Sequence, residues 1–260
     1  MPRPAIHPTR SNEDHSDGIF HELVTKPYSV SSHVRACAVN ESVVLLDLRQ
    51  NKYMMLPPLE SSALAGMVNR WPTSAAHPPT PSDTARNFAR VLQTAGILTS
   101  ELVDTPETHQ GAHPAYDLLA AEDEIEEHKA INISHVVNFI YACVKAAFAV
   151  HFGSLQRLAL TVTANRTRAA EADILPGSQA VLELVDIFSR IRPFIFTARN
   201  HCLFHSLALL AFLSRYRIVP LWVIGVKLNP WGAHSWLESG DKVLDSTPEK
   251  ISEYAPILEA

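Results

Sequence analysis

The stretch that most constrains the fold runs from residue 199 to 247, where an apolar helix precedes two strands. Residues 203–212 are apolar on almost every side of a helix, so this helix must be buried. LWVIGVK at 221–227 predicts a strand of a buried sheet, and AHSWLE at 233–238 alternates as a strand does. VLDST at 243–247 runs back after a short turn, so we expect a buried helix beside an antiparallel hairpin.

Three residues of this stretch form a candidate catalytic set: Cys202 in the first turn of the helix, and His234 and Asp245 on the two following strands. The free N–H groups and the dipole of a helix N-terminus favour a thiolate and can hold an oxyanion. A cysteine that meets a distant His and an Asp in the fold is a candidate nucleophile. Cys37 and Cys143 have no such setting and are expected to be inert and buried.

The length of the hairpin loop decides whether His234 and Asp245 share a face of the sheet. With Ser239-Gly240 as the loop, Asp245 faces His234; with Gly240-Asp241, it faces Trp236 and lies diagonal to His234. Either loop lets the carboxylate reach the imidazole, whereas a three-residue loop puts Asp245 on the opposite face. A structural His–Asp hydrogen bond, or a turn capped by Asp245, stays open as an alternative.

The first half of the chain shows strands followed by helices. Apolar runs at 34–39, 42–48 and 51–56, parted by short turns, predict a β-meander. Helical spacing follows at 59–69 and again at 82–95, where a serine N-cap precedes one apolar stripe. Three strands with two or three helices predict a small winged-helix-like domain.

The patterns give an α+β chain with four segments. Residues 1–26 are polar and proline-rich and are expected to be disordered, and 27–103 form the winged-helix-like domain. Residues 104–114 are the linker, and 115–260 form the domain that holds the candidate site. In that domain we expect helices at 115–130, at 131–160, with a break near Gly153 left open, and at 178–191.

Composition and charge exclude several classes of function. Residues 28–103 hold six Lys or Arg against five Asp or Glu, too little positive charge for DNA binding. Three scattered cysteines argue against a disulfide framework and for a reducing compartment. The N-terminal residues lack a signal-peptide run, and the apolar stretch 131–152 contains polar side chains, which favour a buried helix over a membrane span. We expect a soluble, cytoplasmic protein.

His201 and His205 lie four residues apart beside Cys202, a spacing that can serve a metal. No fourth ligand is evident nearby, and a metal-bound Cys202 would not be a free nucleophile. We therefore expect no metal. Thiol chemistry needs no cofactor, and a dependence on ATP is left open.

Several motifs in order carry a resemblance to a family: CLFHSLALLAFLSRYRI, VIGVK, AHSWLE, GDKVLD and YAPIL. They resemble the lasso-peptide B2 proteins, leader peptidases of the transglutaminase-like (papain-related) cysteine peptidase superfamily. The resemblance covers about residues 115–260 and is densest at 199–257. It implies that Cys202 is the nucleophile, His234 the general base and then acid, and Asp245 the residue that orients His234.

VLLDLRQNKYMMLPPLESSAL resembles the core of the RiPP recognition element, a PqqD-like winged-helix module. The resemblance implies that the leader of a precursor adds as a strand beside 50–56, against the helix that contains Phe88 and Leu92. Tyr53 and Met55 on that strand complete the expected leader-binding set. The extra tail of about 26 residues before the first strand departs from the pattern.

The two resemblances together imply a leader peptidase of lasso-peptide maturation that frees the core amine for macrolactam formation. They imply a precursor with a threonine at the penultimate leader position. They also imply a partner, an ATP-dependent, asparagine-synthetase-like cyclase. Two alternatives stay open: an acyl transferase on the same triad, and a leader-binding chaperone without catalysis.

Overall fold

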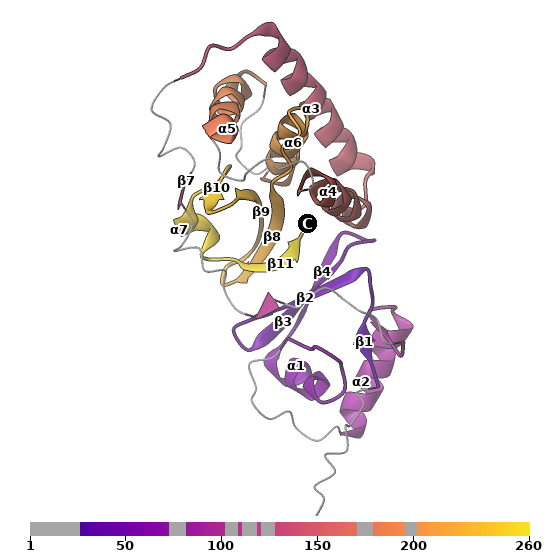
Figure 1. Ribbon diagram of the computed structural model, residues 1–260. Coiled ribbons are helices and arrows are strands. Elements are labelled where there is room, and N and C mark those ends of the chain that lie inside the picture. Colours follow the sequence, from indigo (N-terminus) through magenta and orange to yellow (C-terminus); the bar gives the residue numbers. More distant parts are fainter. Residues whose placement is uncertain are drawn as a thin grey trace, which may run out of the picture.

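The computed structural model describes residues 27–72, 82–101, 109–110, 119–120, 128–170, 179–195 and 202–260. Figure 1 shows a mixed α+β fold in which a smaller N-terminal unit lies below a larger C-terminal unit. The predicted disordered tail, most of the linker and most of the helix expected at 115–130 lie outside the described residues.

The N-terminal sheet contains the predicted meander, and its strand order is β4-β3-β2-β6. Its members are β2 (Val34–Val39), β3 (Ser42–Asp47), β4 (Lys52–Leu56) and the two-residue β6 (His109–Gln110). The β2–β3 turn is tight because Asn40 adopts a positive φ of 56°, a conformation that asparagine tolerates well. Strand β4 is an edge of this sheet, as the leader-binding hypothesis requires.

Helices α1 (Pro58–Ala65) and α2 (Asp83–Thr94) cover one face of that sheet, and their apolar side chains share a core with Val43 and Leu45. Helix α2 begins as predicted, because the Ser82 side chain accepts a hydrogen bond from the Ala85 N–H. Two-residue strands β1 (Ser29–Val30) and β5 (Leu98–Thr99) pair beside these helices. The first predicted helix is shorter than expected and ends at Ala65.

The C-terminal sheet has the strand order β11-β8-β9-β10-β7. Its members are β7 (Leu119–Ala120), β8 (Leu221–Leu228), β9 (Trp231–Ser239), β10 (Lys242–Val243) and β11 (Ala255–Glu259). The expectation of a helix at 115–130 is wrong where the structure describes it: 119–120 is a strand, and 128–130 is not helical. The physical reason is the free edge of β10, whose backbone groups pair in parallel with β7.

Four helices among the described residues lie on one side of this sheet: α3 (Ile133–Phe152), α4 (Leu155–Ala170), α5 (Gln179–Ile191) and α6 (Cys202–Ser214). The short helix α7 (Pro248–Ile251) lies on the other side, and the 3-10 turn η3 (Arg192–Phe194) follows α5. Helix α6 packs between α3 and strand β9 (Figure 1). The break left open near Gly153 is present, since Gly153 separates α3 from α4.

The expectation that 131–160 is largely buried is wrong for α3. Only one face of α3, with Phe139, Ala142 and Ala146, packs into the core, while its outer face is exposed along the edge of the molecule (Figure 1). Among the described residues, α3 is the helix long and apolar enough to span a membrane, and 28% of its most apolar window is buried.

The two units share one core rather than touching through a polar interface. The second face of the N-terminal sheet contributes Cys37, Val44 and Leu46 to the cluster that contains α6 and the C-terminal sheet. At the rim, the Gln156 N–H donates to the Leu48 carbonyl at 3.0 Å and the Leu155 N–H to the Asn51 side chain at 3.0 Å. The turn between β3 and β4 thus caps the start of α4, which holds β4 in place relative to the candidate site.

Candidate active site

Cys202 is the first residue of α6 and is half-buried, while the helix that follows is buried from His205 to Leu213. The other two cysteines behave as predicted. Both are buried, and burial raises the pKa of the Cys37 thiol to about 12 and that of the Cys143 thiol to about 11. Neither forms a thiolate near neutral pH, so Cys202 is the thiol suited to nucleophilic chemistry.

The hairpin after α6 has the even loop that the sequence required. Lys242 pairs with Ser239 and Val243 with Glu238, which leaves Gly240-Asp241 as a two-residue loop. Gly240 has a positive φ of 64°, as such a turn demands. The pairing continues for one more hydrogen bond, from the Leu244 N–H to the Leu237 carbonyl at 2.9 Å. Asp245 therefore falls opposite Trp236, the second of the two predicted registers.

Asp245 nevertheless does not contact His234. Its Oδ1 accepts a hydrogen bond from the Leu237 N–H at 2.8 Å, and its Oδ2 lies 2.7 Å from the Ser206 hydroxyl. Burial of its side chain raises the pKa of the Asp245 carboxyl to about 6, against the opposing effect of these two hydrogen bonds. The direct His–Asp hydrogen bond that the register permits is replaced by a link between the hairpin and α6.

Ser206 makes that link, and sequence reasoning missed it. Its hydroxyl lies 2.7 Å from Asp245 Oδ2, 2.9 Å from the Ser235 carbonyl and 3.0 Å from the Cys202 carbonyl. A single O–H can donate to only one of these acceptors at a time, so the hydroxyl is shared among the three. The signal was present in the sequence, because Ser206 follows Cys202 by one helical turn and Ser235 follows His234 directly.

His234 is buried on β9 and held by other residues. Its Nε2 lies 3.1 Å from the Ser246 hydroxyl, and its ring stacks on Trp236 with centroids 5.9 Å apart and packs against Tyr254 at 5.4 Å. In the part of the chain that the structure describes, its Nδ1 has no hydrogen-bond partner. Burial first, and then Lys250 and Lys227, lowers the pKa of His234 to about 4, so the imidazole is neutral near pH 7.

A second buried histidine, His205, lies near Asp245. Its Nδ1 is 4.0 Å from Asp245 Oδ2, its ring stacks on Phe188, and its Nε2 lies 3.3 Å from Arg192 Nη1. Burial, followed by the charges of Arg192 and His234, lowers the pKa of His205 to about 4, so its approach to Asp245 is not an ion pair near pH 7. Because a guanidinium can only donate, Nε2 is the acceptor and Nδ1 carries the proton that faces Asp245.

The four predicted leader-binding residues lie on two faces of the N-terminal sheet. Tyr53 and Met55 pair with Leu46 and Val44 and face the C-terminal unit. Phe88 is half-buried on the opposite face, and Leu92 is 3% exposed within the N-terminal core. Leu92 therefore offers no surface to a peptide, because its side chain is part of the packing that holds α2 on the sheet.

A pocket lies where the edge strand β4 meets the β8–β9 hairpin. Tyr53 and Met55 line it from one side and Leu228 and Trp231 from the other, and the Tyr53 and Trp231 rings meet edge to face at 5.5 Å. Burial, and then the charges of Cys202 and Cys37, raises the pKa of Tyr53 to about 12. The pocket thus joins the expected recognition strand to strand β9, which also carries His234.

The metal alternative can be tested only in part, because His201 lies outside the described residues. Among the residues that are described, no group of three or more His, Cys, Asp or Glu side chains is placed to hold a metal ion. The Arg192 guanidinium lies 3.3 Å from His205 Nε2, and a cationic group beside an imidazole opposes the binding of a metal cation.

Comparison with known proteins adds one finding. The model of the transglutaminase-like superfamily matches residues 140–259. This part of the chain is a transglutaminase-like domain. The matched range includes α6 and the hairpin, and with them Cys202, His234 and Asp245. Members of this superfamily are typically cysteine-dependent enzymes, so the domain indicates cysteine-based peptidase or acyl-transfer chemistry. A search of the curated proteins and one of the solved structures found no match.

Proposed function

We propose that the chain is the leader peptidase of lasso-peptide maturation, with Cys202 as its nucleophile. One observation carries the proposal: Ser206 joins the turn that begins with Cys202 to the strand of His234 and to Asp245, inside a transglutaminase-like domain. The motifs that resemble lasso-peptide B2 proteins support the substrate class. The protein would act in the cytoplasm, where such precursors are made.

In the proposed reaction His234 is the general base and then the general acid. Its neutral imidazole takes the Cys202 proton on Nδ1, the ring nitrogen that has no partner among the described residues. The thiolate attacks the carbonyl carbon at the leader–core junction, and N–H groups in the first turn of α6 stabilise the oxyanion. The C–N bond then breaks, and His234 returns the proton to the departing core amine.

The second half of the reaction releases the leader. A water molecule attacks the thioester carbonyl while His234 accepts its proton, and the bond to Sγ breaks. The products are a leader with a free carboxylate and Cys202 as the thiol, once His234 has returned the proton. The thiol chemistry requires no metal or other cofactor, and the freed core amine is what an ATP-dependent, asparagine-synthetase-like cyclase would join to a side-chain carboxylate.

Asp245 and Ser246 divide the supporting role between them in this mechanism. Ser246 holds Nε2 of His234, so it fixes the ring orientation and leaves Nδ1 available to accept the Cys202 proton. Asp245 supports His234 indirectly. It accepts hydrogen bonds from the Ser206 hydroxyl and the Leu237 N–H, and so positions α6 against the hairpin. Asp245 as the residue that orients His234 directly remains the alternative.

Leader recognition is proposed at the free edge of β4, where a peptide can add as a further strand. Tyr53 and Met55 would contact alternate leader side chains on the face toward the catalytic hairpin. Met54, which is 41% exposed, and Phe88 would contact the others on the opposite face. In this proposal the leader runs from the recognition strand toward Cys202, and its penultimate threonine lies one residue before the last leader residue, whose carbonyl is attacked.

The experiment incubates the purified chain with the precursor and follows the peptide masses over time. We expect cleavage by the parent and by Cys143→Ala, and loss of at least about a thousandfold in rate for Cys202→Ala, because no other thiol is suited to attack. Cys143→Ala is the matched control, since it removes a buried thiol from the same domain. Cleavage by Cys202→Ala at the parent rate overturns the assignment.

Product masses separate the proposal from its two alternatives. A leader with a free carboxylate indicates hydrolysis, whereas a leader linked to an added amine indicates an acyl transferase, the second chemistry that the superfamily match supports. Leader binding by both the parent and Cys202→Ala, without cleavage even when the cyclase and ATP are present, indicates a chaperone.

A further inference from the structure

The outer face of α3 carries a continuous apolar stripe that the catalytic account does not use. Its members recur every three or four residues, and each is between 50% and 84% exposed: Ile133, Val137, Ile140, Val144, Phe148 and Phe152. The stripe extends along the whole 20-residue helix. Apolar surface of this extent marks an interaction site on a monomer.

The charge of the same region is one-sided. Residues 131–170 contain four Lys or Arg and no Asp or Glu, although the whole chain has a net charge of −5. Arg157 and Arg168 are exposed on α4, on the helix face that also exposes Leu160. Neither they nor Lys145 and Arg166 form an ion pair with any described residue. Helices α3 and α4 therefore carry, beside the apolar stripe, four cations that have no ion-pair partner among the described residues.

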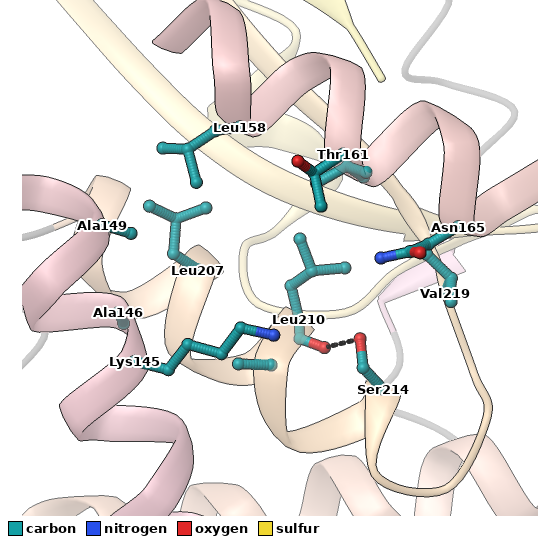
Figure 2. Close-up of a pocket in the computed structure, with 12 residues that line it drawn as sticks. Lys145, Ala146, Ala149, Leu158, Thr161, Asn165, Leu207, Leu210, Ser214 and Val219 are labelled. Atoms are coloured by element: carbon teal, nitrogen blue, oxygen red, sulfur yellow. Dashed lines mark hydrogen bonds between the residues drawn. The ribbon is translucent and has the colours of Figure 1, made fainter. Parts of the chain in front are cut away.

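Figure 2 shows how the two helices join at a half-open pocket between α3, α4 and α6. The pocket has apolar walls that include Leu158, Leu207 and Leu210. Lys145 reaches across it from α3, and Thr161 faces it from α4 (Figure 2). The pocket can hold apolar groups, and the Lys145 ammonium group lies beside it. This combination suits an amphiphile with an apolar tail and an anionic headgroup.

We propose that the α3–α4 face docks on the surface of a bilayer that contains anionic lipid, with α3 lying in the plane of the interface. The apolar stripe enters the headgroup region, and Lys145, Arg157 and Arg168 contact lipid phosphates. Helix α3 does not cross the bilayer, because its inner face with Phe139 and Ala146 is part of the protein core. A second copy fits this face less well, since two such faces repel each other.

Docking in this way leaves the candidate active site free. The pocket contacts α6 only from Leu207 onward, while Cys202 is at the other end of that helix. Leu207, the first α6 residue at the pocket, follows Cys202 by five residues, about 7.5 Å along a helix axis, and Ser214 follows it by 12, about 18 Å. The bilayer would hold the protein without blocking the thiol.

The test is co-sedimentation of the full chain with vesicles of phosphatidylcholine, alone or mixed with phosphatidylglycerol. We expect binding to the mixed vesicles only, weakened by salt. Phe148→Glu should lower the affinity about tenfold, because it places a charge in the apolar stripe. Arg157→Glu should lower it about fivefold or more.

Two matched controls lie far from α3: Leu59→Glu changes an apolar side chain that is 78% exposed, and Arg86→Glu makes the same charge change on α2. Both should bind like the parent, and far-ultraviolet circular dichroism should show that all four variants are folded. Absence of binding to mixed vesicles, or equal binding by Phe148→Glu and Leu59→Glu, overturns the proposal. So does a dimer in light scattering that Phe148→Glu dissociates while no variant binds vesicles.

Discussion

At the scale of single residues, Ser206 is the side chain that connects the candidate nucleophile, the strand of the candidate base and the buried carboxylate. Its neighbours explain why a hydroxyl is needed there. The Asp245 carboxylate is buried, and a buried carboxylate without a hydrogen-bond donor is costly. The hydroxyl also bridges to the Ser235 carbonyl, so it ties α6 to β9 at the residue next to His234.

Ser206→Ala should therefore reduce both stability and activity. We expect a loss of about 1–3 kcal/mol in the free energy of unfolding, because the Asp245 carboxylate is left with one fewer donor. The rate of precursor cleavage should fall about tenfold or more as α6 shifts against the hairpin. Urea unfolding and cleavage kinetics measure the two effects.

Ser214→Ala is the matched control for this change. Ser214 lies on the same helix and also donates to the carbonyl four residues before it, at 2.7 Å from Leu210, but it lies near the distant pocket. Its loss should cost about 1 kcal/mol or less and leave the cleavage rate unchanged. Equal effects from the two variants would show that the Ser206 bridge has no special role.

The sequence could predict the position of Cys202 in the first turn of a buried helix and a two-residue hairpin loop, but not the hydrogen bonds that Asp245 makes in place of one to His234. The spacing of paired strands places Asp245 close enough to contact His234. The β9–β10 pairing ends at Val243, however, and beyond that point the pairing no longer determines the direction of the Asp245 side chain. The Leu237 N–H is a free donor at that point, and Asp245 accepts from it. Tertiary contacts of this kind leave no pattern in the sequence.

At the scale of elements, the strand pair β8–β9 shapes the surroundings of His234. Gly225 pairs with His234 across the two strands, and a Cβ there would lie 2.6 Å from the Trp236 ring and 2.9 Å from Tyr254 Cβ. The same two rings pack against the His234 imidazole. Gly225 thus makes room for the aromatic side chains that hold His234 in place.

Gly225→Ala should displace the Trp236 ring and disturb His234. We expect a loss of about 1–3 kcal/mol in the free energy of unfolding and a lower kcat for precursor cleavage. Gly232→Ala is the control on the same strand pair, because its Cβ would come no closer than 3.5 Å to the nearest atom. It should change stability by less than about 0.5 kcal/mol. Chemical denaturation measures the stability of both variants, and cleavage kinetics measure kcat. A fully active Gly225→Ala variant would show that the aromatic side chains beside Gly225 are not needed to hold His234.

Elements with strong local patterns were predictable, and those fixed by neighbours were not. The meander, the Ser82 cap and the break at Gly153 follow from turn and capping chemistry that is local to the chain. Strand β7 has no such pattern and exists because β10 offers a free edge. Polar residues on α3 favoured a buried helix, yet the stripe around Val144 and Phe148 is exposed.

At the scale of the whole molecule, the shared core joins the proposed recognition strand and the candidate nucleophile in one packed structure. Val44 and Leu46 of the N-terminal sheet pack into the same cluster as Leu207 and Ala208 of α6. The edge strand β4 is therefore held at a fixed place relative to Cys202. A leader bound at that edge would reach the thiol without any movement between the units, which is the preorganisation that efficient cleavage requires.

The most direct test of the central claim is the intact mass of the protein soon after mixing with its precursor. We expect a transient thioester adduct that adds the mass of the leader less one water to the protein, present in the parent and in Cys143→Ala and absent in Cys202→Ala. His234→Ala should slow its formation, because no base then takes the thiol proton. An adduct or continued cleavage in Cys202→Ala would contradict the assignment of Cys202 as the nucleophile.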